Sequence, residues 1–162
     1  EVGADGTWSL DLTPAQTTQL VQGQDGASLE ITANLSDAAG NPAPEATRSV
    51  DVDTTAPSIV ITEPVDADGI INIADSGSDL TINGTADGTD SVAVTVNGTN
   101  VATATVTGSD WSVDIPSVTL QAVSDGDTIQ ITAEGSDDAG NTGSDDTSLD
   151  TDYTAPTVAK QS

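Results

Sequence analysis

Aspartate is the residue type in this chain best suited to chemistry, and it falls mainly in loops and at strand ends. Of the 27 acidic residues, 22 are aspartate and 5 are glutamate, whereas only Arg48 and Lys160 are basic. The short aspartate side chain favours turns and binds hard cations from loops. A surface acidified only for solubility would use glutamate as well. The composition therefore predicts turn-forming and cation-binding carboxylates ahead of simple solvation.

Several kinds of chemistry are excluded by the residues that the chain lacks. Without cysteine or histidine, it can build neither a thiolate or imidazole metal site nor a Ser–His or Cys–His nucleophile. Paired carboxylates would still permit glycosidase chemistry. However, only three aromatic residues are available to line a sugar cleft, so we expect no enzyme.

The formal charge of −25 bears on possible partners. Such a chain cannot neutralise phosphates, so we expect no binding to nucleic acid or to an anionic membrane surface. No apolar run approaches the roughly 20 residues that span a bilayer, so no membrane insertion is expected. We expect a monomer.

The sequence contains an internal repeat. Four blocks occur twice in the same order: 6–12 and 109–115, 25–33 and 125–133, 36–41 and 136–141, and 55–57 and 154–156. The last pair gives a period of 99 residues. We therefore expect 1–54 to be the C-terminal half of one repeat, 55–153 to be a complete repeat, and 154–162 to begin the next repeat or a linker.

The periodicity within the repeat is that of β-strands. Apolar and polar residues alternate in seven segments: 58–62, 80–85, 91–96, 101–106, 111–115, 128–134 and 147–152. Asn97-Gly98 predicts a type I′ hairpin. No helix of convincing length is expected. Seven to eight short strands in 99 residues predict an all-β fold of tandem immunoglobulin-like sandwiches, with Trp8 and Trp111 anchoring the cores.

Strand direction sorts the loop aspartates to the two ends of the complete repeat. The end where the repeat begins receives Asp87, Asp90, Asp137 and Asp138, and the preceding strand brings Asp51 and Asp53 to this junction. The opposite end receives Asp66, Asp68, Asp75, Asp125, Asp127, Asp150 and Asp152. Crowded carboxylates repel one another unless a divalent cation lies among them, and Ca²⁺ accepts 6–8 oxygen ligands. Both clusters are therefore candidate calcium sites.

Turn formation is the alternative role for some of these side chains. Asp37 and Asp137 lie in Asp-x-Ala-Gly-Asn, where turn formation and metal binding fit equally well. Asp51 and Asp53 end a strand, which favours metal binding. Two rival functions also stay open: a repeat that itself binds a carbohydrate or another surface ligand, and acidic residues that only confer solubility in salt.

The ordered motifs resemble bacterial immunoglobulin-like repeats of giant calcium-dependent RTX adhesins that are exported by type I secretion. The motifs are Thr-Ala-Pro, Gly-x-Trp-Ser, Val94-Thr95-Val96-Asn97-Gly98-Thr99, Ser-Asp-x-Ala-Gly-Asn and Asp-x-Asp-x-Thr-Ala-Pro. The resemblance implies an extracellular spacer on a bacterial surface, in contact with neighbouring repeats, that projects a distal ligand-binding domain for attachment or biofilm formation. It also implies calcium at the linkers, ligated by Asp51 and Asp53 and, by repetition, by Asp150 and Asp152.

Overall fold

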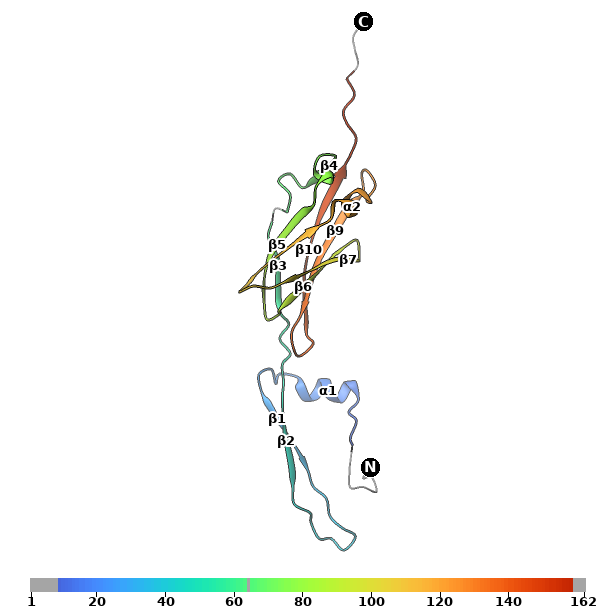
Figure 1. The fold of residues 1–162 in the computed structure, drawn as a ribbon. Coiled ribbons are helices and arrows are strands. Elements are labelled where there is room, and N and C mark those ends of the chain that lie inside the picture. Colours follow the sequence, from blue (N-terminus) through green and yellow to red (C-terminus); the bar gives the residue numbers. More distant parts are fainter. Residues whose placement is uncertain (1–8, 64, 159–162) are drawn as a thin grey trace. The chain divides into compact units, whose positions relative to one another are not determined.

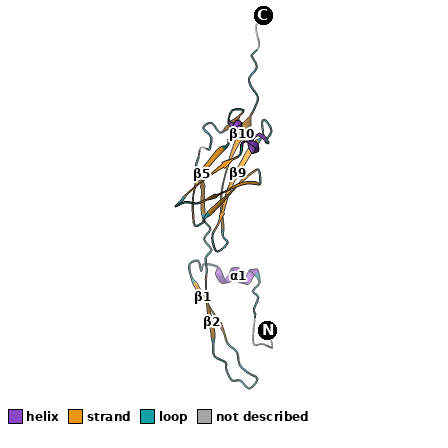
Figure 2. Cartoon of the chain, viewed as in Figure 1, coloured by secondary structure: helices purple, strands orange, loops and turns teal. Residues whose placement is uncertain are grey.

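The chain forms two compact units in a computed structural model that describes residues 9–63 and 65–158. Unit 1 is Glu1–Thr55 and unit 2 is Ala56–Ser162. Figure 1 labels their helices and strands, and Figure 2 distinguishes helix, strand and loop.

Unit 2 is a sandwich of two sheets. The three-stranded sheet has the order β3 (Ser58–Ile61), β5 (Leu80–Asp87) and β8 (Asp110–Ile115). The five-stranded sheet has the order β4 (Ile70–Asn72), β10 (Thr142–Asp152), β9 (Thr128–Ser136), β6 (Ser91–Val96) and β7 (Thr99–Thr105). All pairs are antiparallel except β4 with β10. Eight strands in two sheets confirm the predicted immunoglobulin-like sandwich.

The core of unit 2 comes from the inward-facing residues of the alternating strands. Both sheets contribute buried side chains, among them Ile59, Ile82, Val94, Ile131 and Leu149. Because successive strand residues point to opposite faces, the polar residues between them face outward. The pattern of every second residue thus builds one apolar layer between the sheets.

Trp111 is part of this core, as predicted, and is 3% exposed. Its indole ring lies against Gly84, the residue opposite it on β5, where a Cβ would lie 2.3 Å from a ring carbon. Among the described residues, its Nε1 is the one buried side-chain polar atom without a hydrogen-bond partner. The matching Trp8 lies outside the described residues.

The sequence indicates no helix of convincing length, but the described residues contain three short helices. Helix α1 (Pro14–Val21) has Thr13 as its N-cap, whose side chain accepts from the Gln16 amide while the Gln16 side chain accepts from the Thr13 amide. Such a capping box satisfies two amides of the first turn. Helix α2 (Ser117–Gln121) and the 3₁₀ turn η1 (Asp75–Gly77) are shorter. In the described part of the chain, none of these helices has the length and apolarity to cross a membrane.

Two loop predictions can be compared with the backbone. Asn97 and Gly98 have φ values of 49° and 78°, and these positive values confirm the type I′ hairpin between β6 and β7. The segment between the predicted strands 58–62 and 80–85 contains the short strand β4, and β10 begins five residues before the predicted strand at 147. Pairing with β10 and β9, respectively, extends these segments beyond what alternation indicates.

Unit 1 contains α1 and a two-stranded antiparallel sheet of β1 (Ser28–Ala33) and β2 (Ala46–Asp51). Among the described residues of this unit, only Val52 is buried. By the internal repeat, β1 corresponds to β9 and β2 to β10, but no second sheet covers them within the described residues of unit 1. The apolar side chains that would face it are therefore exposed.

Candidate functional site

The loop aspartates of unit 2 gather at two opposite ends, as the strand directions predict. We call residues 87–90 and 137–141 the hairpin end, because the turn between β9 and β10 lies there. Residues 66–75, 124–127 and 150–154 form the exit end, where the chain leaves unit 2 after β10. The Thr89 hydroxyl donates to the Ser136 carbonyl at 2.8 Å, which joins the loops of the hairpin end. At the exit end, the Gly126 amide donates to the Thr151 carbonyl at 3.0 Å, and the Asp150 amide to the Gly69 carbonyl at 3.1 Å.

At the hairpin end, Asp137 forms a turn. Its carboxylate accepts the Asn141 amide and the Asn141 side-chain nitrogen, each at 2.8 Å. The Asn141 side chain is the main reason why the pKa of Asp137 lies below its ordinary value. Asp37 makes the same contacts with Asn41 in unit 1. The structure thus gives Asp137 the turn role, and metal binding by Asp137 stays a prediction.

The other three predicted ligands of the hairpin end lie around this turn. Asp87 ends β5 opposite Ser58, the first residue of β3. Asp90 precedes β6, and its carbonyl accepts the Val106 amide at 2.9 Å. Asp138 is exposed beside Asp137. All four aspartates lie at one end of the sandwich. Their role as metal ligands stays a prediction.

At the exit end, Asp68 and Asp75 act on the carboxyl group of Asp66 in the β3–β5 connection. The pKa of Asp66 is raised, first by burial, then by a hydrogen bond with Asp68, and also by the negative charges of Asp75 and Asp68. The pKa of Asp68 is lowered, mainly because its Oδ1 accepts the Ile70 amide at 3.0 Å. The only basic residues of the chain, Arg48 and Lys160, lie outside 56–158. This negative charge therefore has no protein cation in that range to neutralise it.

The end of β10 brings further carboxylates to the same place. Asp152 pairs in register with Asn72 of β4, two residues beyond Asp150. The Asp150 carboxylate accepts the Thr128 hydroxyl at 3.1 Å, and that of Asp152 accepts the Thr154 amide at 3.0 Å. Asp68 and Asp152 line one groove of about 540 Å³. Two carboxylates that are 84 residues apart in the sequence thus border the same groove.

In unit 1, Asp51 ends β2 opposite Ser28, and Asp53 follows it beyond the strand. The Asp53 carboxylate accepts the Thr55 amide at 3.0 Å, as Asp152 does with Thr154. The second aspartate of each Asp-x-Asp pair therefore forms a local turn. In the described ranges of the two units, no three acidic side chains stand close enough to hold one ion as they are placed.

Two aspartates that the sequence prediction did not assign to the linker contact it directly. The Asp25 carboxylate accepts the Thr54 amide and the Thr55 hydroxyl, each at 2.6 Å. In unit 2, the Asp125 carboxylate accepts the Tyr153 amide and the Thr154 hydroxyl, each at 2.5 Å. These bonds lower the pKa of both carboxyls. The Asp-Gly pair that recurs at 25–26 and 125–126 is the sequence signal that could have indicated these contacts.

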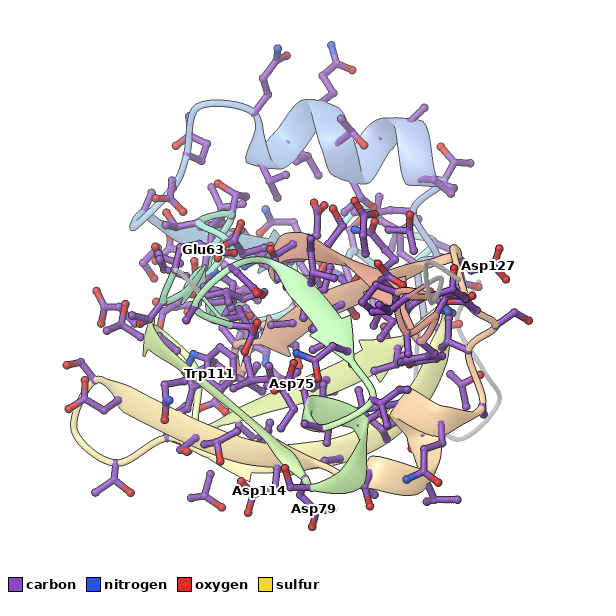
Figure 3. The ribbon with its side chains drawn as sticks, turned by 90° about the horizontal axis from the view of Figure 1, so that it is seen from above. Glu63, Asp75, Asp79, Trp111, Asp114 and Asp127 are labelled. Atoms are coloured by element: carbon purple, nitrogen blue, oxygen red, sulfur yellow. The ribbon has the colours of Figure 1, made fainter. Side chains whose placement is uncertain are left out.

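Two further aspartates stabilise a strand pair and the start of a helix. Asp79 accepts the Ser117 amide at 2.8 Å, and Asp114 accepts the Thr81 hydroxyl at 2.6 Å. Figure 3 shows these two acids close together where β5 begins and β8 ends. They hold the start of α2 and the β5–β8 pair.

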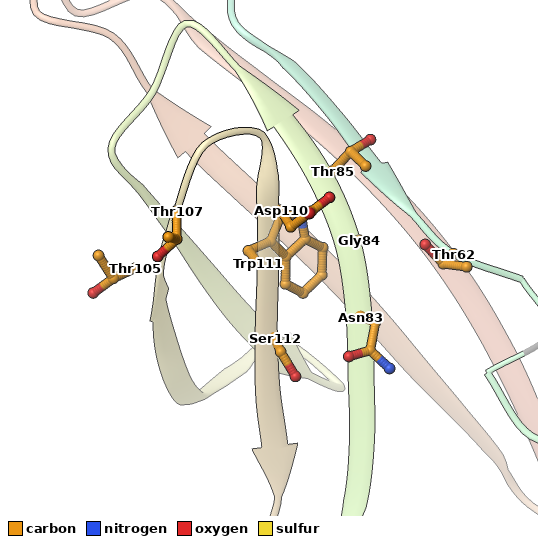
Figure 4. Close-up of a pocket in the computed structure, with 9 residues that line it drawn as sticks. All are labelled: Thr62, Asn83, Gly84, Thr85, Thr105, Thr107, Asp110, Trp111 and Ser112. Atoms are coloured by element: carbon orange, nitrogen blue, oxygen red, sulfur yellow. The ribbon is translucent and has the colours of Figure 1, made fainter.

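The hollow beside Trp111 bears on the carbohydrate alternative. It has a volume of about 480 Å³ and is lined mainly by threonine, asparagine, serine and aspartate side chains (Figure 4). Stacking against a sugar needs an exposed aromatic face, but Trp111 is 3% exposed. Its ring lies against Gly84 and is not presented to a ligand.

Comparison with known proteins gives similarity to solved adhesin structures. No protein-family model and no curated protein matches the chain. The chain is 28% identical to a 1.5-MDa bacterial ice-binding adhesin, over 94% of this chain and 49% of that one, with a TM-score of 0.47. It is also 28% identical to a Ca²⁺-stabilised adhesin that helps an Antarctic bacterium bind ice, over 95% of this chain and 37% of that one, with a TM-score of 0.48.

A third structure is a bacterial immunoglobulin-like domain of the M. primoryensis ice-binding adhesin. Identity to it is 27%, over 60% of this chain and 98% of that one, with a TM-score of 0.40. The chain is thus similar to bacterial immunoglobulin-like adhesin domains. It spans about half or less of the first two structures. With every TM-score below 0.5, the sandwich fold of unit 2 is assigned from its own strand order and core.

Proposed function

We propose that this chain is a calcium-stiffened extender segment of a bacterial cell-surface adhesin. Its repeats are spacers that hold a distal ligand-binding domain away from the cell, outside a bacterium that exports the protein by type I secretion. The ordered motifs of the two repeats support the adhesin role. The carboxylates at the exit end of unit 2 support calcium binding.

The observation that carries the calcium proposal is the groove shared by Asp68 and Asp152. One carboxylate comes from the β3–β5 connection and the other from the last residue of β10. Asp66 and Asp75 add charge beside Asp68, and no basic side chain lies between residues 56 and 158. Because like charges repel in the absence of a cation, this arrangement favours a divalent ion.

The donor set fits calcium in kind. It consists of carboxylate oxygens, and Ca²⁺ accepts such ligands in flexible geometry. Asp68 and Asp152 would hold the ion, with Asp66, Asp75 and Asp150 as further ligands. The ion would supply two positive charges between the linker and the loop. Asp51 and Asp53 are proposed as ligands at the preceding linker, and the four aspartates of the hairpin end as ligands in unit 2.

The expected gain in stability follows from linkage. Sites in extracellular proteins bind calcium with dissociation constants of about 10⁻⁴–10⁻³ M. A tenfold excess of calcium over that constant stabilises the folded state by about 1–2 kcal/mol per site. The low calcium level inside cells would leave the sites empty and the linkers flexible before export.

Titration calorimetry and small-angle scattering test the proposal. We expect calcium uptake in the millimolar range, and a shorter maximum dimension and lower melting temperature after EDTA treatment. Asp68→Asn and Asp152→Asn should weaken the uptake. Asp114→Asn should not, because Asp114 does not line the groove and its carboxylate bonds to Thr81. If sodium chloride raises the melting temperature as much as calcium does and no uptake is seen, the acids only confer solubility.

A further inference from the structure

The two units hold the chain beyond their last strand in the same way. In unit 1, the Asp25 carboxylate accepts three hydrogen bonds from Thr54 and Thr55, namely from the Thr54 amide, the Thr54 hydroxyl and the Thr55 hydroxyl. In unit 2, Asp125 accepts the Tyr153 amide and the Thr154 hydroxyl. These partners lie 28 to 30 residues from the aspartate in the sequence. The contact is therefore tertiary and not a local turn.

The backbone fixes each aspartate in place. The Gly26 amide donates to the Val52 carbonyl, and the Val52 amide to the Ala27 carbonyl, each at 2.9 Å. In unit 2, the Gly126 amide donates to the Thr151 carbonyl and the Thr151 amide to the Asp127 carbonyl, each at 3.0 Å. Gly26 and Gly126 have φ values of 71° and 82°, which glycine adopts without strain. The Asp-Gly turn is thus tied to the end of the strand, and its carboxylate extends past that end.

The residues that these carboxylates hold have no strand beside them. β2 ends at Asp51 and β10 at Asp152, so the amides of Thr54 and Tyr153 lie beyond both sheets. Unbonded chain at such a point samples many φ and ψ values, and each residue that becomes ordered loses that freedom. Asp25 and Asp53 together bond the amides of Thr54 and Thr55. Asp125 and Asp152 do the same for Tyr153 and Thr154.

The hydroxyl of the first linker residue makes a different contact in each unit. Thr54 donates its hydroxyl to Asp25, whereas Tyr153 directs its hydroxyl to the Leu120 carbonyl at 3.0 Å. Burial, followed by the charge of Asp125, raises the pKa of Tyr153. Although Tyr153 stands where unit 1 has Thr54, Asp125 still accepts the amide of that residue and the hydroxyl of the next one, Thr154. The shared part of the arrangement is therefore the Asp-Gly carboxylate on the first two linker residues.

We propose that Asp25 and Asp125 are positioning residues that form a latch independent of metal. The latch fixes the direction in which the chain leaves each repeat, using only protein hydrogen bonds. This deepens the extender function proposed above and rests on it, because it assigns part of the linker stiffness to the protein and the remainder to calcium. Empty calcium sites would then leave the first two linker residues ordered.

Hydrogen exchange in EDTA tests the latch directly. In the whole chain, we expect the amides of Thr54 and Tyr153 to exchange at least about tenfold more slowly than in an unstructured peptide. Asp25→Ala should restore fast exchange at Thr54, and Asp125→Ala at Tyr153. Glu30→Ala and Glu134→Ala remove an exposed carboxylate from β1 and β9 and should leave both rates unchanged. Slow exchange at Ile131 in every variant shows that unit 2 stays folded.

A distance measurement gives the consequence for the linker. The chain has no cysteine, so spin labels can be placed at Ser49 and Ser148, which are exposed on β2 and β10. In EDTA, Asp25→Ala should broaden the distance distribution between the labels relative to the unmutated chain, and Glu30→Ala should not. An equal width in all three proteins would overturn the latch.

The results separate this inference from the calcium proposal. If Thr54 and Tyr153 are protected only when calcium is present, Asp25 and Asp125 are metal ligands and the latch is wrong, while calcium stiffening stands. If both amides are protected in EDTA and calcium changes neither the scattering nor the melting temperature, the latch stands and calcium stiffening is wrong.

Discussion

Several aspartates in this chain accept hydrogen bonds from loop amides. Asp37, Asp53, Asp68 and Asp152 each accept an amide two residues later in the sequence. The aspartate carboxylate lies close enough to its own backbone to make this bond, which is why aspartate favours turns. The excess of aspartate over glutamate thus follows in part from the number of tight loops, whether or not an ion binds.

Two carboxyl groups should titrate in opposite directions. The Thr55 hydroxyl and the Thr54 amide stabilise ionised Asp25, so we expect its pKa below the ordinary value of 3.8. Burial and Asp68 disfavour ionised Asp66, so we expect its pKa above 3.8. Carbon-detected NMR titration of both carboxyl groups in EDTA measures this. Midpoints in the reverse order would contradict the hydrogen bonds described.

Asp25 and Asp66 should also change the stability of the fold with pH in opposite directions. The contribution of Asp25 is present above the pKa of the unfolded chain and is lost as pH falls through the lower folded pKa. For Asp66, the folded state holds the proton more tightly, so stability is lost as pH rises through the raised pKa. Calcium competes with the proton and should lower the midpoint of Asp66. Asp25 should not respond, which makes it the internal control.

At the scale of elements, β1 and β9 have closely similar sequences but different surroundings. Ile31 of β1 is 49% exposed, whereas the matching Ile131 of β9 is fully buried. Val50 of β2 is 43% exposed, and the matching Leu149 of β10 is 3% exposed. The alternation that predicts a buried face is therefore present in both strands. Only unit 2 has the opposing sheet among its described residues.

This difference predicts unequal effects of the same mutation. Ile131→Val removes a buried methylene and should destabilise unit 2 by about 0.5–1.5 kcal/mol. Ile31→Val removes the same group from an exposed face and should change the stability by less than about 0.5 kcal/mol. Urea unfolding followed by circular dichroism measures both. Equal losses would show that β1 is packed against a core in solution.

Gly84 of β5 is required by the ring of Trp111. An added Cβ would lie 2.2 Å from the Val60 carbonyl oxygen and 2.3 Å from the indole. Gly84→Ala should therefore destabilise unit 2 by about 1–3 kcal/mol or more, because the ring or a backbone must move. Gly77→Ala has no atom within 4 Å of the new Cβ and serves as the control. Thermal unfolding of the two variants should differ clearly.

The sequence predicted the repeat, the sandwich and the strands with clear alternation, because these follow from periodicity. It did not predict β4, whose three residues form a strand only by pairing with β10. It also did not predict α1, although Thr13 and Gln16 form a recognisable capping box. The contact of Asp125 with the linker joins residues that lie 28 positions apart. The repeated Asp-Gly pair marks the turn but does not specify the residue that the carboxylate binds.

For the whole molecule, the charge of −25 acts in addition to any local site. Self-repulsion weakens a compact state and is screened by salt over about 10 Å at 0.1 M ionic strength. Part of any stabilisation by salt is therefore independent of specific ions. Calcium must exceed the effect of sodium chloride at equal ionic strength to count as specific.

The internal repeat predicts what would complete unit 1. Residues 56–108 form the part of unit 2 that precedes the block matching residues 6–12, and they supply β3, β5 and β6 of its core. Joining a second copy of 56–108 directly ahead of Gly6 should therefore bury Ile31 and Val50 under an opposing sheet. We expect slow hydrogen exchange at both residues and a second cooperative unfolding transition, since a closed sandwich acquires its own core.

The control is the same fusion with Ile82→Asp in the added segment, which places a charge in that core and should abolish both effects. Fast exchange at Ile31 in the first fusion would contradict the residue-by-residue correspondence between β1 and β9.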